Sequence, residues 1–274
     1  MKWMKSCLLP LLLLVFQGTI SAQAEYAATV VSSVPAMRAG DSEVASRAAP
    51  TAESINNAGC RHLDAGHYER AIEQFKLAIS LKPQLSAAHN NLGYAYAQSG
   101  RLTEAIVALK EATRLNPSNV AAHFNLGRVY FSAGQLPDAV TYLQKAIALK
   151  PDYAAAYDQL GSAYEQMGRR KEALKCLLEA VRLNPQNTYA LNNLGVVQSN
   201  AKQYDAAIKT LRRALELNPD FAQAQYNLGS LYAATKDKRA ALALHATLKQ
   251  LDAELGKKLF GEIYSDKILD ASRK

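Results

Sequence analysis

The hydrophobic pattern of the chain is that of short amphipathic helices arranged in pairs. From residue 52 onward, apolar residues recur three and four positions apart within runs of about twelve to fourteen residues, and polar residues fill the positions between them. Glycine separates the two runs of several pairs, at Gly100, Gly134 and Gly168, where a helix C-terminus favours a left-handed residue. The pattern predicts an all-α fold made of helical hairpins.

The helical hairpins are copies of one another. Frames of 34 residues begin, without insertion or deletion, at Ala52, Ser86, Val120, Ala154, Thr188 and Ala222. Each frame has glycine at its eighth place and alanine at its twentieth, and proline ends the second run of the first five frames. Small side chains let two helices approach closely, and proline stops a helix. Because one helix pair cannot bury its apolar face alone, the repeat predicts a stack of six pairs.

One frame, NNLGYAYAQSGRLTEAIVALKEATRLNP from Asn90 to Pro117, resembles the tetratricopeptide repeat (TPR) family, and the resemblance covers about three-quarters of the chain. It implies a right-handed α-solenoid of six stacked helix-turn-helix units followed by a C-terminal capping helix. The expected units are residues 52–85, 86–119, 120–153, 154–187, 188–221 and 222–255. The last unit is degenerate at its end. The first frame departs from the family pattern at Ala58 and His62, and the fifth at Gln198.

Residues 1–24 have the pattern of a cleaved export signal. Lys2 and Lys5 precede an apolar run from Cys7 to Phe16, and small residues stand before residue 25. The apolar run is about half as long as the ~20 residues that a membrane span requires. The sequence therefore predicts a mature protein without a membrane span. Together with the resemblance to bacterial repeat proteins, it predicts a location in the bacterial periplasm or secretion from the cell.

Two further segments flank the repeats. Residues 25–51 lack helical or alternating periodicity, so a flexible leader is expected, with a short cap on the first unit as the alternative. Residues 256–274 carry apolar residues at helical spacing with charges between them, which predicts a capping helix and tail. The alternative for this segment is an amphipathic helix that binds a partner or a membrane surface.

Composition and charge fit a folded protein. Apolar residues make up 49% of the chain and charged residues 20%, which is a globular balance. Removal of the two lysines in residues 1–24 lowers the formal net charge from +8 to +6 (8 − 2). Basic residues near the C-terminus alternate with acidic ones, which favours solvated helix faces over a nucleic-acid patch and leaves a preference for acidic partners open. Cys60 and Cys176 lie more than three frames apart, too far for a disulfide in a solenoid.

The resemblance implies that the first helix of each unit lines a concave ligand-binding groove. The sixth place of the frames carries a row of amides, here called the amide ladder: Asn57, Asn91, Asn125, Gln159, Asn193 and Asn227. An amide both donates and accepts, which suits the backbone of an extended peptide of any sequence. The ladder is similar to that in the substrate groove of the enzyme that transfers N-acetylglucosamine to intracellular proteins. The alternative is that these amides satisfy neighbouring backbone groups or bond one another between stacked helices.

Other candidate groove residues flank the ladder. They are Asn90, Tyr94, Phe124, Arg128, Asp158, Asn192 and Tyr226, a mixture of aromatic anchors and polar contacts. Family members that grip a terminal carboxylate do so with lysine and arginine in the first three repeats. Arg128 is the only cation at these places, so a two-carboxylate clamp is not expected.

No motif for catalysis, metal binding or a cofactor accompanies the repeats. The chain lacks a phosphate-binding glycine loop, a Gly-x-Ser-x-Gly elbow and a His-Glu-x-x-His helix. His89 and His123 hold equivalent places, but equivalent atoms on stacked helices lie ~8 to 10 Å apart, too far to share one zinc ion. The sequence predicts a non-enzymatic scaffold outside the cytoplasm that binds an extended peptide of a protein partner. The alternative is a receptor for a glycan or another polymer in the same groove.

Overall fold

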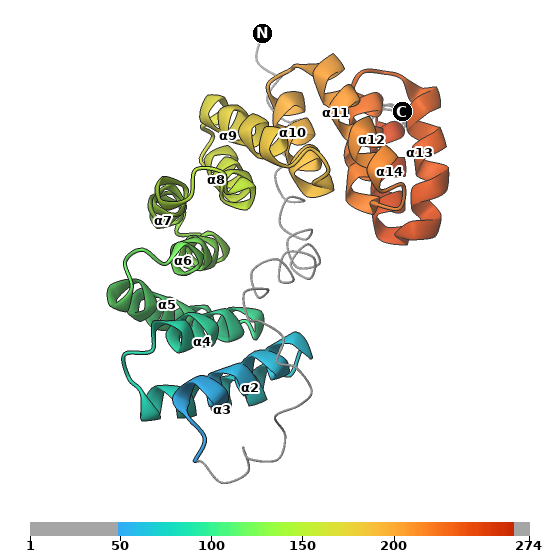
Figure 1. Ribbon diagram of the computed structural model, residues 1–274. Coiled ribbons are helices and arrows are strands. Elements are labelled where there is room, and N and C mark those ends of the chain that lie inside the picture. The colour runs from blue at the N-terminus through green and yellow to red at the C-terminus, as the bar shows by residue number, and fades with distance from the viewer. Residues whose placement is uncertain (1–48, 266–274) are drawn as a thin grey trace. The chain divides into compact units, whose positions relative to one another are not determined.

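The computed structural model describes residues 49–265, which form thirteen helices and no strand. The predicted signal, most of the predicted leader and the end of the tail lie outside this range. The helices follow one another as hairpins (Figure 1): α2 (Ala52–Asp64), α3 (Tyr68–Leu81), α4 (Ser86–Gln98), α5 (Leu102–Leu115), α6 (Val120–Ser132), α7 (Leu136–Leu149), α8 (Ala154–Gln166), α9 (Arg170–Leu183), α10 (Thr188–Asn200), α11 (Tyr204–Leu217), α12 (Ala222–Ala234), α13 (Lys238–Leu251) and α14 (Ala253–Ile263). The prediction of an all-α helical-repeat fold is confirmed.

The described residues fall into two compact units whose border lies within α8. The N-terminal unit ends at Ala163, and the C-terminal unit begins at Tyr164. Within each unit the two helices of a hairpin pack together. The first helices of adjacent frames also touch one another, as α4 and α6 do in the N-terminal unit and α10 and α12 in the C-terminal unit. The first helices therefore form a continuous layer within each unit.

Close packing within each hairpin depends on the glycine at the eighth place. A Cβ atom added at Gly93 would lie 2.5 Å from Cγ of Leu109, and one added at Gly127 would lie 2.7 Å from Cγ of Leu143. Both leucines are fully buried, so neither has room to retreat. The predicted role of these glycines in close helix approach is confirmed.

A left-handed residue follows the first helix in each of the six described hairpins. The angle φ lies between 72° and 80° at Gly66, Gly100, Gly134 and Gly168. In the fifth and sixth frames Lys202 and Lys236 take this place, with φ of 62° and 66°. A side chain makes this conformation less favourable, by roughly 1–2 kcal/mol, than it is for glycine. The fifth and sixth hairpins thus keep the left-handed turn although they lack the glycine.

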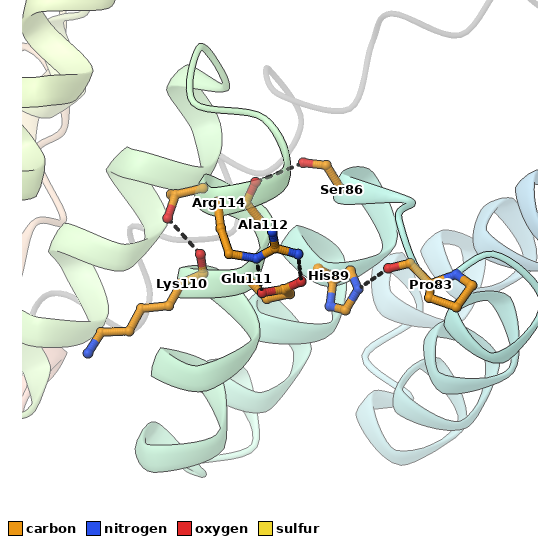
Figure 2. Close-up of polar contacts among 8 residues, drawn as sticks. Pro83, Ser86, His89, Lys110, Glu111, Ala112 and Arg114 are labelled. Atoms are coloured by element: carbon orange, nitrogen blue, oxygen red, sulfur yellow. Dashed lines mark hydrogen bonds and ion pairs between the residues drawn. The ribbon is translucent and has the colours of Figure 1, made fainter.

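In the second, third and sixth frames a polar side chain at the fourth place bonds the turn that precedes its hairpin. His89 Nε2 lies 2.8 Å from the carbonyl oxygen of Pro83, and His123 Nε2 lies 2.9 Å from that of Pro117 (Figure 2 shows the first pair). A carbonyl oxygen only accepts, so the histidine nitrogen donates. In the sixth frame the amide of Gln225 makes the same contact with Pro219. The histidines thus bind the turn between frames.

The C-terminal helix α14 completes the last hairpin. In the first five frames a leucine or phenylalanine stands at the twenty-fourth place, but the sixth frame has His245 there. Leu259 of α14 packs against Gly229 instead, since a Cβ atom on that glycine would lie 2.5 Å from its Cδ2. Leu259 is fully buried, and His245 Nδ1 bonds the carbonyl oxygen of Gly256 at 3.0 Å. The capping helix begins at Ala253 because the Asp252 side chain accepts from the N–H of Leu255.

Candidate functional site

The candidate groove residues differ in how far solvent reaches them. Within the amide ladder Asn57 is exposed, and partial burial is found at Asn91, Asn125, Gln159 and Asn193. Partial burial also applies to three flanking residues, namely Asn90, Tyr94 and Arg128. The remaining candidates are buried: Phe124, Asp158, Asn192, Tyr226 and Asn227. A ligand would therefore reach the half-buried side chains of α4 and α6 more easily than the buried ones of α12.

In the N-terminal unit the ladder amides bond to neighbouring first helices. The Nδ2 group of Asn91 donates to Oδ1 of Asn56 at 3.1 Å and to Sγ of Cys60 at 3.3 Å. The Nδ2 group of Asn90 donates to Oδ1 of Asn91 at 3.3 Å. Asn91 thus uses both of its N–H groups and its oxygen within the protein. At Asn91 the ladder amide therefore bonds side chains of a neighbouring first helix, which is the structural alternative to ligand binding.

Asn125 differs from Asn91 because much of its bonding capacity is unused. Its Nδ2 group donates to Oδ1 of Asn90 at 3.1 Å, which fixes the plane of the amide. Among residues 49–265 no other hydrogen bond to this side chain is found, so its oxygen and its second N–H are free of protein partners. Asn125 therefore offers one acceptor and one donor in a fixed orientation.

Two cations and two aromatic rings form a chain of contacts beside Asn125. The Cζ atom of Arg128 lies 5.6 Å from the centre of the Phe124 ring, which lies 4.8 Å from the centre of the Tyr153 ring. The Nζ atom of Lys150 lies 5.4 Å from the centre of the Tyr153 ring. These residues, here called the Arg128 cluster, come from α6 and from the segment between α7 and α8.

Burial governs the electrostatics of this region. It lowers the pKa of the Arg128 guanidinium, which the hydroxyls of Tyr94 and Tyr153 partly offset. It also raises the pKa of Tyr94, against the opposing influence of Arg128. Both shifts mean that the charged form of each side chain has lost favourable hydration. Tyr94 on α4 and Arg128 on α6 are close enough to affect one another.

In the C-terminal unit the corresponding first-helix residues are covered. The Nδ2 group of Asn227 donates to Oδ1 of Asn192 at 2.8 Å, and the Asn227 oxygen accepts from Gln223 at 3.2 Å. The hydroxyl of Tyr226 donates to Glu262 of α14, and Tyr226 is only 1% exposed. Burial first, and then the bond to Glu262, raise the pKa of Tyr226. The capping helix thus covers this end of the predicted groove.

Sequence reasoning missed Lys150 and Tyr153 as members of the candidate site. Both lie in the segment between α7 and α8, outside the first helices that carry the predicted groove residues. The thirty-fourth place, which Tyr153 occupies, shows no regular pattern, because Asn119 and Phe221 occupy it in other frames. Only the contact between Tyr153 and the Phe124 ring reveals its place beside Arg128.

The described residues contain no cluster suited to a metal ion. No group of three or more histidine, cysteine, aspartate or glutamate side chains converges within residues 49–265. Over the same range no helix has both the length and the hydrophobicity that a membrane crossing requires. Cys60 and Cys176 are unpaired thiols, and burial raises the pKa of both.

Comparison with protein families identifies the repeat. The family models described as TPR repeat and tetratricopeptide repeat match residues 56–111, 93–134, 127–168, 154–187, 176–209 and 200–236. The chain belongs to the tetratricopeptide repeat family. The matched segments run without a gap from residue 56 to residue 236, and proteins of this family generally mediate protein–protein interactions and are generally non-enzymatic. No curated protein sequence matches the chain.

Solved TPR structures share the fold. MamA is 28% identical, with a TM-score of 0.54 over 59% of this chain and 94% of its own. PilF of Pseudomonas aeruginosa is 18% identical, with a TM-score of 0.68 over 77% of this chain and 97% of its own. YrrB, described as a TPR protein with an unusual peptide-binding site, is 24% identical, with a TM-score of 0.54 over 67% of this chain and 96% of its own. The similarity to PilF and YrrB concerns the fold alone.

Proposed function

We propose that this TPR protein is a non-catalytic scaffold that holds an extended segment of another protein along the first helices of its N-terminal unit. The observation that carries the proposal is the state of Asn125, which is fixed by Asn90 and keeps an unused donor and acceptor. An extended peptide presents N–H and C=O groups along its length, and such an amide pairs with both. The bond to Asn90 orients the amide in advance, which lowers the entropic cost of binding.

Tyr94 supports the same location. It is half-buried on α4, the first helix next to that of Asn125, and partly exposed tyrosines often anchor a peptide side chain. Tyr94 and Asn125 together provide an aromatic contact and a backbone contact on adjacent helices. Binding of one short segment at such a surface is expected to be micromolar, about 8 kcal/mol.

The test is a pull-down from cell-envelope extract, read out by mass spectrometry, with the protein from residue 25 onward as the immobilised bait. It compares the parent with Asn125→Ala and with the control Val107→Ala. Val107 is a 66% exposed apolar residue on the second helix α5. Asn91→Ala is unsuitable because it removes bonds to Asn56 and Cys60 that hold the helices together.

The proposal expects a discrete protein that the parent and Val107→Ala retain and Asn125→Ala loses while its circular dichroism is unchanged. Retention of the same proteins by all three baits would contradict binding along the first helices. Loss in Val107→Ala alone would place the site on the second helices. Retention of a polysaccharide and of no protein would favour a polymer receptor instead.

We also propose that the protein acts outside the cytoplasm. This proposal rests on residues 1–24, which lie outside the described residues, and on their charge and apolar pattern. The test is the intact mass of the full chain after expression in a Gram-negative host. The expected product lies in the periplasmic fraction and lacks residues 1–24, whereas a chain with Leu12→Arg and Leu13→Arg stays uncut. An uncut parent chain in the cytoplasm would refute export.

A further inference from the structure

Arg128, which lies over the Phe124 ring, differs from the two arginines that lie over tyrosine rings. The Cζ atoms of Arg101 and Arg169 each lie 4.5 Å from the centre of a ring, that of Tyr96 or Tyr164. Arg101 and Arg169 each also hold a carboxylate at 2.9 Å, that of Glu104 or Glu172. These two arginines therefore have both a ring and a counter-ion.

Arg128 has a ring and no counter-ion. Its Cζ atom lies 5.6 Å from the centre of the Phe124 ring, but no carboxylate or other acceptor among residues 49–265 bonds its guanidinium. Lys150 adds a second positive charge, 5.4 Å from the centre of the Tyr153 ring. A half-buried guanidinium with unused donors is costly, because water no longer solvates it fully. Within the described residues, the Arg128 cluster therefore joins two positive charges without a protein counter-ion at Arg128.

We propose that Arg128 binds the carboxylate of an aspartate or glutamate side chain in the bound peptide. This inference rests on the proposed function, because the peptide backbone is held at Asn125. Asn125 and Arg128 are three residues apart on α6, so their side chains lie on the same face of the helix. A side chain next to the anchored peptide bond therefore comes within reach of the guanidinium, which binds a carboxylate through two parallel N–H bonds.

The surroundings favour an internal side chain over a peptide C-terminus. Arg128 lies on α6, with the first helices α2 and α4 before it and α8 after it in the chain. A peptide that follows the first helices passes Arg128 and need not end there. A C-terminal aspartate or glutamate carries two carboxylates, one on its side chain and one at the chain end. Arg128 is the only guanidinium among the candidate groove residues, so it suits a single carboxylate better.

The test uses a synthetic array of random peptides of about twelve residues, long enough to cross several helices at ~3.3 Å per residue. The array is made once with amidated C-termini and once with free C-termini, and all N-termini are acetylated. The parent protein begins at residue 25 and extends to the C-terminus. It is compared with the variants Arg128→Gln and Arg128→Glu and with the control variant Arg212→Gln. Arg212 is an exposed arginine on α11.

The parent and Arg212→Gln are expected to enrich aspartate or glutamate at one position of the amidated peptides. Arg128→Gln should lose this enrichment and keep the other preferences, and Arg128→Glu should replace it with lysine or arginine. Peptide binding without any acidic preference would refute this inference and leave the proposed function standing. Binding that requires a free C-terminus would refute it in favour of a terminal carboxylate. An array without any bound peptide would refute both proposals.

A pairwise measurement on one selected peptide then tests direct contact. Replacement of its acidic residue by the amide, or Arg128→Gln in the protein, is expected to weaken binding by at least about tenfold. The two changes together should weaken it hardly more than either alone, because both remove the same bond. Multiplicative losses would show that Arg128 and the acidic residue act separately, which would refute the contact.

Discussion

At the scale of single residues, identical side chains in the amide ladder serve different purposes. Asn91 uses its N–H groups and its oxygen within the protein, whereas Asn125, one frame later, uses only one N–H. The difference arises from two neighbouring places: Cys60 accepts from Asn91 where the next frame has Tyr94, and the fifth-place residue differs as well. Asn90 bonds Asn91 on its own helix, but Phe124 offers Asn125 no such bond. Equal places in a repeat therefore do not imply equal roles.

Arg128 is expected to lower the stability of the free protein. Replacement by methionine keeps an unbranched aliphatic side chain at this place and removes a poorly solvated charge, so Arg128→Met should raise the free energy of unfolding by about 1 kcal/mol. The measurement is urea unfolding followed by circular dichroism. Arg101→Met is the matched control, because that change breaks the bond to Glu104 and is expected to be neutral or destabilising. A less stable Arg128→Met would show that the arginine is a structural residue.

Gly127 tests the packing of the hairpin. In Gly127→Ala the new Cβ would meet Leu143 Cγ at 2.7 Å and the Leu143 backbone nitrogen at 3.1 Å. Overpacking costs ~1–3 kcal/mol, and the better helix propensity of alanine recovers at most about 1 kcal/mol. Urea unfolding should therefore show a net loss. Gly261→Ala, which meets no atom within 4 Å, should be neutral or slightly stabilising, and an equal loss in both would exclude the packing explanation.

Cys176 is expected to be a poorly reactive thiol. Burial raises its pKa to about 11, which disfavours the thiolate that reacts with disulfide reagents. At pH 8 in the absence of denaturant, the thiolate fraction is about 100-fold lower than for a thiol with a pKa near 9. With Cys7 and Cys60 replaced by serine, labelling by a chromogenic disulfide should be slow and should accelerate in urea to the rate of a free thiol. Equal rates with and without urea would contradict burial of this thiol.

At the scale of helices, α14 replaces a side chain that the sixth frame lacks. Leu259 takes the position against Gly229 that a leucine of the second helix takes in other frames. Leu259→Ala should lower the free energy of unfolding of the C-terminal unit by about 2–5 kcal/mol, because Leu259 is fully buried. The exposed neighbour Lys257 provides the control variant Lys257→Ala, which urea unfolding should not distinguish from the parent. Equal stability of Leu259→Ala and the parent would refute the capping role.

The helices themselves could be predicted from the sequence, because the hairpin pattern is local. Apolar spacing and the eighth-place glycine both act within one frame. The structure confirms the helices, and it confirms the close helix approach at Gly93 and Gly127. The candidate site could be predicted only in outline, since the partner of each side chain depends on the adjacent frame. No periodic signal distinguishes Asn125 from Asn91 or places Tyr153 beside Phe124. The apolar spacing after the sixth frame predicted the capping helix α14, and His245 at an otherwise apolar place is a second sign in the sequence that α14 is required.

At the scale of the whole molecule, the described helices contact mainly their neighbours in sequence. In such an array the stability of one hairpin depends on its own packing and on the adjacent interfaces. A local defect should therefore raise the opening frequency of nearby helices and leave distant ones unchanged. Leu259→Ala and Gly127→Ala place one defect in each compact unit, which allows the two responses to be compared directly.

The measurement is native-state hydrogen exchange resolved by peptide fragments. Leu259→Ala should speed amide exchange in α12, α13 and α14 and leave α4 and α5 as protected as in the parent. Gly127→Ala should speed exchange in α6 and α7 and leave α12 and α13 unchanged. If either variant instead speeds exchange throughout residues 49–265, the array opens as one cooperative body, and nearest-neighbour coupling does not describe it. Separate responses would mean that a peptide bound at Asn125 and Arg128 stabilises the N-terminal unit without altering the capped C-terminal end.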